Sequence, residues 1–385
     1  MGRLQGKLQD HALDGTILME NTDLYYFAGS IQQGFFFVPA AGDPIFLVKR
    51  NYERARDESS WDGVYPLSGF KELPSVLAEH GFKDIKKMGL ELDVLPVNIY
   101  RRLLKLFPGT EFNDISTVLR EIRMIKSNYE IDCLRRAGDV ALAVNRQIPA
   151  LLQAGKAEVH LSAEIENLYR FAGHQGVLRM RAFNAEMFFG HVYSGANGAF
   201  HSFADSCTGG SGVATACPQG GGWKKLAPHE PIGVDYGAIY GGYIIDHTRI
   251  FSIGELPGDL LEAYTVAVGI QDAVVEQAIP EVSCGDLYNL ALDIADKRGL
   301  GNNFMGCGPE QVKFVGHGIG LEIDELPVIG KGSKHMLAEG MVFALEPKFI
   351  FPGRGMVGIE NVWHVTAKGL EKLSPIPDDL VTVPL

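Results

Sequence analysis

The chain has 385 residues, of which 46% are hydrophobic and 21% are charged, and its formal net charge is -12. This length allows two domains that each bury a core of their own, and the composition is that of an ordinary globular protein. The acidic balance, without any block of Lys and Arg, disfavours binding to nucleic acid or to an anionic membrane.

The cysteines and the N-terminus indicate the compartment. Five cysteines are an odd number, and none stand at Cys-x-x-Cys spacing, so we expect reduced thiols rather than a disulfide framework. Cys207 and Cys217 could still close a loop. The N-terminal string MGRLQGKLQD has no apolar run typical of a signal peptide, and no window approaches 18 uninterrupted apolar residues. We therefore expect a cytoplasmic protein without a membrane span.

The first part of the chain alternates strand-like and helical patterns. Short apolar runs at residues 16–20, 34–38 and 44–49 predict strands, and helical spacing predicts helices over 72–81 and 98–107. This alternation predicts a small α/β domain over residues 1–120. Since the segment carries no cluster of metal ligands, we expect it to serve packing, assembly and substrate gating.

The rest of the chain, residues 121–385, changes to long helices and repeats one order of elements. Helices that begin near residues 129 and 162 are followed by extended segments, and helices over 259–279 and 283–299 are followed by extended segments again. We interpret this order as a weak internal duplication. Two related halves that face each other would enclose a central cleft, which is a common place for a site.

Between the two copies lies a segment rich in Gly and Ser, SFADSCTGGSGVATACPQGGG, at residues 202–222. A phosphate-binding loop is one interpretation, but the segment lacks the GxxxxGK[ST] order and no apolar helix follows it. We therefore expect a flexible loop beside the cleft.

A first predicted hairpin, GVDYGAIYGGYIIDHTRIF, carries two acids. A turn at residues 240–241 would place Asp235 directly opposite Asp246. Like charges at opposed positions destabilise a buried hairpin unless something neutralises them. A protonated pair or a solvated edge would explain a single instance.

A second predicted hairpin, FALEPKFIFPGRGMVGIENVWHV, repeats the arrangement. A turn centred on Gly353 would place Glu346 opposite Glu360. Two such pairs in one domain favour bound cations over a protonated pair.

Four carboxylates and one imidazole can hold two divalent cations, because charges of +4 and −4 cancel. Oxygen ligands with one nitrogen suit Mn, Co, Fe or Zn. His317 is the expected imidazole, since its flanking glycines let the backbone approach closely and expose the ring. A structural histidine is the usual interpretation of a lone His, and the paired acids favour the ligand instead.

The order Asp-x10-Asp, then HGIG, then Glu-x13-Glu, with the strings DHTR, GHGIGLE, LEP and IEN, resembles the pita-bread metallohydrolases. This family includes Xaa-Pro aminopeptidases, prolidases, methionine aminopeptidases and creatinases. The resemblance covers the chain from about Arg120 onward, and the string REIRMIKSNYEIDCLRRA resembles the junction into the catalytic domain. It implies an α+β pita-bread domain with a pseudo-two-fold repeat over residues 121–385, preceded by a creatinase-like α/β domain, and a homodimer.

The resemblance also implies two divalent metal ions and a role for each of five ligands. Asp235 would chelate one metal, Asp246 and Glu360 would bridge both metals, and His317 and Glu346 would complete the second.

Three residues have implied roles beside the metals. Glu346 would take a proton from a metal-activated water and pass it to the leaving nitrogen. His201, which ends SGANGAFH, would bind substrate or steady the transition state, although Phe200 stands where the family often has Pro. Thr248 would orient the bridging water or Asp246, with an ordinary strand threonine as the alternative.

Three departures from the family pattern bear on the substrate. Asp324 stands where peptidases of the family usually have a second histidine, so it is either protonated or serves a different substrate group such as an amine. Gly358 stands where an arginine often pairs with a substrate carboxylate, and Lys348, in place of a glycine, could compensate. The segment 202–222 lengthens the spacing from His201 to Asp235 and should line or cover the cleft.

The resemblance implies a metal-dependent hydrolase that cleaves Xaa-Pro bonds in small peptides, as aminopeptidase P or prolidase does. The first alternative is a creatinase-like amidinohydrolase or a lyase that acts on a small molecule such as a small amide. Asp324, Gly358 and the lengthened loop favour it. The second alternative is a non-catalytic scaffold, for which eroded ligands would be expected, and none of the five is eroded.

Overall fold

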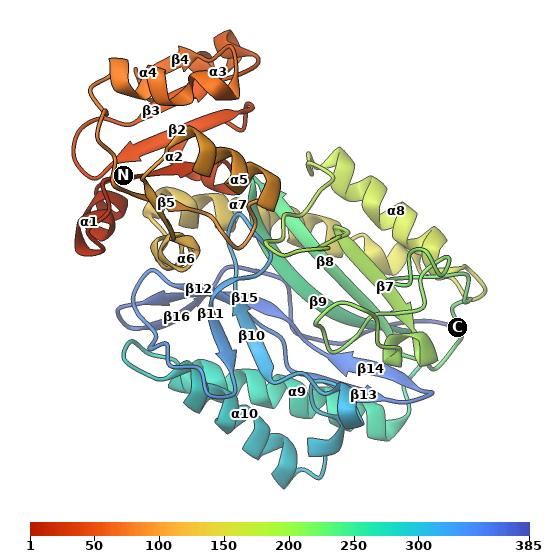
Figure 1. The fold of residues 1–385 in the computed structure, drawn as a ribbon. Helices are drawn as coiled ribbons and strands as arrows, with labels where there is room; N and C mark the ends of the chain where they lie inside the picture. Colours follow the sequence, from red (N-terminus) through yellow and green to blue (C-terminus); the bar gives the residue numbers. More distant parts are fainter. The chain divides into compact units, whose positions relative to one another are not determined.

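The computed structural model describes residues 1–385 and contains ten α-helices and 17 strands (Figure 1). The chain forms two compact units. The first consists of Met1–Arg123 together with Arg181–Asn184, and the second consists of Met124–Met180 and Ala185–Leu385. No helix is both long and apolar enough to cross a membrane.

The first unit is a six-stranded sheet in the order β4-β3-β2-β1-β5-β6 with a core on each face. Successive residues of a strand point to opposite faces, and accordingly Phe36 of β2 lies in one core and Phe37 in the other. The expected strands and helices of this part are confirmed as β1, β2, β3, α4 and α5. The elements are α1 (Gly2–Asp10), β1 (Gly15–Leu18), α2 (Asn21–Ala28), β2 (Gly34–Pro39), β3 (Ile45–Val48), α3 (Tyr52–Glu58), β4 (Val64–Pro66), α4 (Leu73–Glu79), β5 (Lys87–Leu90), α5 (Val97–Leu106), β6 (Glu111–Asp114) and α6 (Ser116–Met124).

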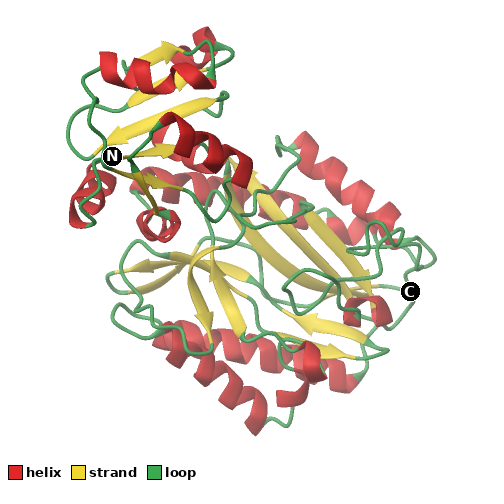
Figure 2. Ribbon diagram, viewed as in Figure 1, coloured by secondary structure: helices red, strands yellow, loops and turns green.

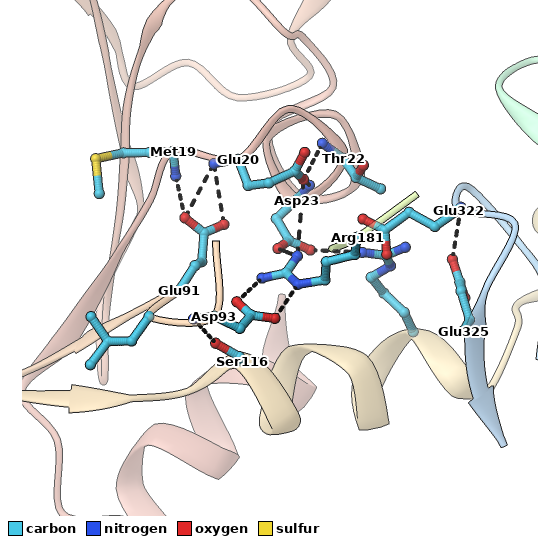
Figure 3. Close-up of polar contacts among 12 residues, drawn as sticks. Met19, Glu20, Thr22, Asp23, Glu91, Asp93, Ser116, Arg181, Glu322 and Glu325 are labelled. Carbon is cyan, nitrogen blue, oxygen red and sulfur yellow. Dashed lines mark hydrogen bonds and ion pairs between the residues drawn. The ribbon is translucent and has the colours of Figure 1, made fainter. Parts of the chain in front are cut away.

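The short segment Arg181–Asn184 belongs to the first unit although its sequence neighbours belong to the second. Arg181 is the anchor of this segment: its guanidinium lies 2.6 Å from a carboxylate oxygen of Asp23 and 2.7 Å from one of Asp93 (Figure 3). Asp23 is fully buried and also pairs with Arg123 at 3.1 Å. Since a buried carboxylate needs a partner, these contacts tie the segment to the first unit.

The second unit contains three sheets and four long helices. The sheets have the orders β17-β9-β8-β7, β11-β10-β12-β15-β16 and β13-β14. The elements are α7 (Asn128–Asn145), α8 (Glu158–Phe171), β7 (Gly190–Ser194), β8 (Ile232–Tyr240), β9 (Tyr243–Ile253), α9 (Gly258–Gln277), α10 (Cys284–Lys297), β10 (Phe314–Gly318), β11 (Glu325–Gly330), β12 (Val342–Leu345), β13 (Lys348–Phe351), β14 (Gly355–Gly358), β15 (Asn361–Thr366), β16 (Gly369–Lys372) and β17 (Val381–Val383).

The expected internal repeat is confirmed in the order of elements. Two helices, α7 and α8, precede β7, and two helices, α9 and α10, precede β10. Helix α7 packs on β8 and β9 and α8 on β7, whereas α9 packs on β13 and β14 and α10 on β11, so each pair of helices covers strands of its own half (Figure 2).

Helix α8 begins at Glu158, four residues before the expected Ser162. The start of the helix is set by tertiary contacts of Glu158 with residues distant in the sequence. The buried Glu158 carboxylate accepts hydrogen bonds from the Ser194 hydroxyl (2.6 Å), the Asn197 amide (2.7 Å) and the backbone N–H of Gly222 (3.0 Å). These contacts fix the first turn without a local capping sequence.

The expected register of the first acid-bearing hairpin is wrong by two residues. Strand β8 pairs with β9 so that Tyr240 faces Tyr243, Asp235 faces Thr248 and Asp246 faces Gly237. The turn is Gly241-Gly242, and both glycines have positive φ (58° and 86°), which a two-residue hairpin turn favours. The two acids still share a face, because a two-residue shift preserves the alternation of the strand.

The expected register of the second hairpin is confirmed. Lys348 pairs with Gly358 in β13 and β14, and Leu345 pairs with Asn361 in β12 and β15. Glu346 and Glu360 lie at the junction between these two ladders, where the hairpin passes from one sheet into the other.

All five cysteines are free, including Cys207 and Cys217, so the loop closure considered for this pair is not formed. Cys207 is buried in the core of the second unit.

Candidate metal centre

The five expected ligands come from both halves of the second unit. Asp235 lies on β8 and Asp246 on β9, in the sheet of the first half. His317 lies on β10, in the sheet of the second half. Glu346 directly follows β12, and Glu360 directly precedes β15, in the same sheet.

Three of the five form a compact ligand group. One side-chain atom each of Asp246, His317 and Glu360 lies within 4.8 Å of the others. Two carboxylates and one imidazole are a donor set that fits a divalent transition metal. The chemistry of these residues therefore fits the group that the family resemblance implies.

His317 turns its two ring nitrogens to different partners. Nδ1 lies 3.3 Å from Oδ1 of Asp324 and 3.2 Å from the carbonyl oxygen of Gly318. Nε2 faces the acids, 3.9 Å from Oε1 of Glu346 and 3.8 Å from Oε1 of Glu360. Burial lowers the pKa of this imidazole, but the surrounding carboxylates, Asp324 first, raise it to about 9.

The glycines beside His317 serve close packing, as expected. A Cβ on Gly316 would overlap the carbonyl oxygen of Ala344, and one on Gly318 would overlap that of Leu326. The expectation that the ring is exposed is wrong, since His317 is only 8% accessible. The same close approach of β11 and β12 that requires the glycines encloses the ring.

Lys348 points into the acids. Its Nζ lies 2.8 Å from Oε2 of Glu346, 3.0 Å from Oε2 of Glu360 and 3.2 Å from Oδ2 of Asp235. Burial lowers the pKa of this ammonium, yet the three carboxylates raise it well above its ordinary value. An ammonium has three donors, and all three are engaged, so Lys348 is not free to receive a substrate carboxylate in place of the arginine that Gly358 lacks.

Burial and neighbouring charges shift the pKa values of Asp246 and Glu360. Burial raises the pKa of Asp246 well above its usual range, and the nearby Glu360 carboxylate adds to the shift. Burial raises the pKa of Glu360 to about 7, although Lys348 opposes the shift. The hydroxyl of Thr248 donates to Oε2 of Glu360 at 2.8 Å, so of the two expected partners, the bridging water and Asp246, the carboxylate of Asp246 is replaced by that of Glu360.

A cleft opens over the acids. Its lining includes Asp324, whose side chain is 46% exposed, together with Asp205, Thr208 and Gln219 from the segment 202–222. The expectation that this segment lines the cleft is thus confirmed. His201 does not line this cleft; it lines a neighbouring cavity that shares Ala204, Asp205, Ser206 and Phe314 with it.

Sequence reasoning missed one histidine of the cleft. His191 of β7 pairs with Asp235 across the strands and lies 3.2 Å from the Gln219 amide, and burial lowers the pKa of its ring. No local signal marks it, because the pairing joins segments more than 40 residues apart in the sequence. The direction of Lys348, in contrast, follows from alternation: it stands two residues after Glu346.

The fold and the candidate ligand group fit a metallopeptidase, and comparison with known proteins gives the family. The sequence profile described as metallopeptidase family M24 matches residues 132–367, and the profile of the creatinase/prolidase N-terminal domain matches residues 1–125. The chain belongs to metallopeptidase family M24 and is an enzyme of the pita-bread fold.

Relatives align over nearly the whole chain. An Xaa-Pro dipeptidase of Pyrococcus horikoshii is 26% identical over 378 residues, which is 97% of this chain and 96% of that protein. A probable dipeptidase, PepE, of Mycobacterium tuberculosis is 29% identical over 98% of this chain and 94% of its own length.

Solved structures of similar proteins have the same fold over nearly the whole chain. An Xaa-Pro dipeptidase from Bacillus anthracis has a TM-score of 0.84 at 25% identity and covers 99% of this chain and 98% of its own. The prolidase from Pyrococcus horikoshii OT3 has a TM-score of 0.83 at 25% identity, covering 98% of this chain and 99% of its own.

Proposed function

We propose that this enzyme uses a divalent metal at Asp246, His317 and Glu360 to hydrolyse the peptide bond that precedes proline in short peptides. The observation that carries the proposal is the three-residue ligand group, with its atoms within 4.8 Å, inside the part of the chain that matches family M24. The Xaa-Pro dipeptidases among its relatives support the choice of bond.

A bound divalent metal supplies a Lewis acid and an activated water at neutral pH. The chain itself supplies the proton acceptor, for which we propose Oε1 of Glu346. Oε2 of the same carboxylate is held by Lys348, which leaves Oε1 on the side of His317. From there the proton would pass to the leaving nitrogen.

The identity and number of the metal ions belong to the proposal as well. Oxygen ligands with one imidazole favour Mn, Co, Fe or Zn. The resemblance implies two such ions on five ligands. Lys348 contacts three of these five residues, Asp235, Glu346 and Glu360, so its position is relevant to the number of metal ions.

His201 remains a predicted substrate-binding residue. The cavity that it lines shares four residues with the cleft over the acids, so a substrate that extends from one into the other would meet it. Asp324, which lines the cleft itself, remains a predicted contact for a substrate amine.

The test is a hydrolysis assay of the metal-loaded protein against Xaa-Pro dipeptides, longer Xaa-Pro peptides and small amides, with and without a chelator. We expect metal-dependent cleavage before proline, and a loss of more than about 100-fold in Asp246→Asn, since a ligand contributes at least as much as an outer-shell partner. Asp259→Asn is the matched control, because Asp259 pairs only with the exposed Arg354. Wild-type rates in Asp246→Asn, or cleavage unaffected by the chelator, would refute the proposal.

A second candidate is hydrolysis of a small amide. One observation favours it: apart from the fully engaged Lys348, no Lys or Arg lines the cleft, so the carboxylate of a free dipeptide meets no available cation there. The same assay decides, because this candidate requires small amides without a carboxylate to be cleaved faster than any Xaa-Pro dipeptide.

We also propose a homodimer in the cytoplasm. The family resemblance supports the dimer, and the five free cysteines are consistent with a reducing compartment. Sedimentation of the purified chain at twice its 42.0 kDa mass would support the dimer, and sedimentation at the single mass would contradict it.

A further inference from the structure

Lys348 is a buried cation in the middle of the candidate metal centre. Only 2% of its side chain is accessible, and its three hydrogen-bond acceptors belong to Asp235, Glu346 and Glu360. A lysine in such a place satisfies acids that would otherwise need another cation, because a buried carboxylate without a partner is strongly unfavourable.

The two glutamates divide their oxygens between two sides. Oε2 of Glu346 and Oε2 of Glu360 face Lys348, whereas Oε1 of each faces Nε2 of His317. The centre therefore has a side with an imidazole and a side with an ammonium. Asp246 joins the imidazole side, and Asp235 joins the ammonium side.

The strand opposite Lys348 approaches it closely. Gly358 is its strand partner, and a Cβ added to Gly358 would lie 2.6 Å from Cα of Lys348, 2.6 Å from the carbonyl oxygen of Pro347 and 2.7 Å from Cγ of Lys348. Real Cβ atoms essentially never come so close to another heavy atom. A side chain at position 358 is thus excluded first by the backbone of Pro347 and Lys348, so Gly358 fits the close approach of the two strands.

We propose that this centre binds one divalent metal ion, held by Asp246, His317 and Glu360, and that the ammonium of Lys348 takes the place of a second. A metal ion on the oxygens that Lys348 contacts would put two cations on the same acceptor atoms, where their charges repel. Asp235 and Glu346 then serve as ion-pair partners of Lys348. The inference deepens the proposed function and rests on it only in requiring that a divalent metal binds here.

The first measurement is the metal content of the purified protein after saturation with Mn²⁺ and removal of the free ion. We expect one Mn²⁺ per chain in the wild type and two in Lys348→Gly, which removes the ammonium and opens its space. Lys224→Ala is the matched control. Lys224 is also an ion-paired lysine, bound to Glu230 and the Ser194 hydroxyl, and its variant should keep one Mn²⁺.

The second measurement needs no variant. Electron paramagnetic resonance of the Mn²⁺-loaded wild type should show the six-line signal of an isolated ion at one equivalent, and a second equivalent should add only the signal of free Mn²⁺. A spin-coupled spectrum that appears with the second equivalent would overturn the inference.

The outcomes separate the inference from the proposed function. Two ions per chain in the wild type overturn the inference and leave the metal-dependent peptidase intact. No bound Mn²⁺ in either the wild type or a folded Lys348→Gly overturns both. Thermal melting of Lys348→Gly with and without Mn²⁺ reports its folding, and should show a larger rise in Tm with the metal than the wild type shows.

Discussion

At the scale of single residues, Asp324 is the departure from the family pattern that the structure explains best. Its carboxylate lies 3.3 Å from Nδ1 of His317, which leaves Nε2 turned toward Glu346 and Glu360. A carboxylate on one ring nitrogen fixes the orientation of a histidine and strengthens the other nitrogen as a ligand. We propose that Asp324 holds the candidate ligand His317 in place, in addition to the roles that the sequence suggested for it.

We therefore expect Asp324→Asn to weaken metal binding by about 10-fold, because the loss of such a partner typically costs 10–100-fold in affinity. The measurement is a competition titration with a chelating dye. Asp205→Asn is the control, since Asp205 lines the same cleft without a contact to His317. Equal affinities in Asp324→Asn and the control would contradict the role.

The buried His247 gives the fold an acid-sensitive group. Burial lowers the pKa of its imidazole to about 3, with the Arg249 charge adding to the shift, and Tyr169 is its neighbour at 3.3 Å. The unfolded chain takes up this proton near pH 6.5 and the folded chain does not. The stability that neutral His247 contributes is therefore present above pH 6.5 and is lost as the pH falls from there toward 3.

Between pH 7.5 and pH 5, in excess chelator, we expect the wild type to lose about 2 kcal/mol more unfolding free energy than His247→Leu loses. Urea unfolding of both chains at the two pH values measures the difference. The same pH dependence in both chains would show that His247 does not carry the effect.

The residues of the centre were predictable to different degrees. The order and spacing of the acids and His317 carry their own signal, and the structure gathers Asp246, His317 and Glu360 as expected. The ion pairs of Lys348 depend on which oxygens face it in three dimensions, and the place of His191 depends on the register of β7 against β8. The place of His191 and the contacts of Lys348 with Asp235 and Glu360 join distant segments, which no local pattern encodes, whereas the contact of Lys348 with Glu346 joins residues two apart.

At the scale of elements, the two hairpins show what decides a predicted register. The second hairpin was predictable because its turn is centred on one glycine, Gly353, and pairing extends from Phe351 and Gly355 on both sides. The first has three candidate turn residues, Tyr240, Gly241 and Gly242, and the positive φ of both glycines selects the later pair. Helix α8 was misplaced for another reason, since its start is fixed by the partners of Glu158.

Helix α7 contains a glycine that packs against another segment. A Cβ on Gly138 would overlap the carbonyl oxygen of Leu373, whereas a Cβ on Gly269, in α9, would meet nothing within 4 Å. Alanine normally stabilises a helix interior over glycine by about 0.5–1 kcal/mol. We expect that gain for Gly269→Ala and a loss of about 1–3 kcal/mol for Gly138→Ala, as for other overpacked sites. Chemical denaturation of the two variants provides the test, and stabilisation by Gly138→Ala would contradict the packing argument.

At the scale of the whole molecule, the ligand group joins the two halves of the second unit. Asp246 belongs to the sheet of β7, β8 and β9, whereas His317 lies on β10 in the sheet that contains β12 and β15. A metal ion bound to both residues is a link between two sheets that the backbone connects through α9 and α10 and again through residues 373–380, between β16 and β17.

Metal removal should therefore loosen both halves. At free metal of about 100 times Kd, binding adds about 2.7 kcal/mol to the stability of the folded state. Amides of β8, β9, β10 and β12 that exchange only on unfolding should then slow by about 100-fold relative to the metal-free protein. Hydrogen exchange read by mass spectrometry measures this, with strands β1 to β6 as the internal comparison. Slowing confined to one of the two sheets would contradict the link.

The placement of Arg181–Asn184 in the first unit has a consequence for synthesis. The polypeptide finishes residue 123 with Asp23 and Asp93 still lacking the guanidinium of Arg181. The first unit therefore cannot complete the buried ion pair between Arg181 and Asp23 on the ribosome until helices α7 and α8 have also been made. A nascent chain released after residue 123 should be more sensitive to protease than the same residues in the finished protein. The reason is that Asp23 and Asp93 then lack the guanidinium of Arg181.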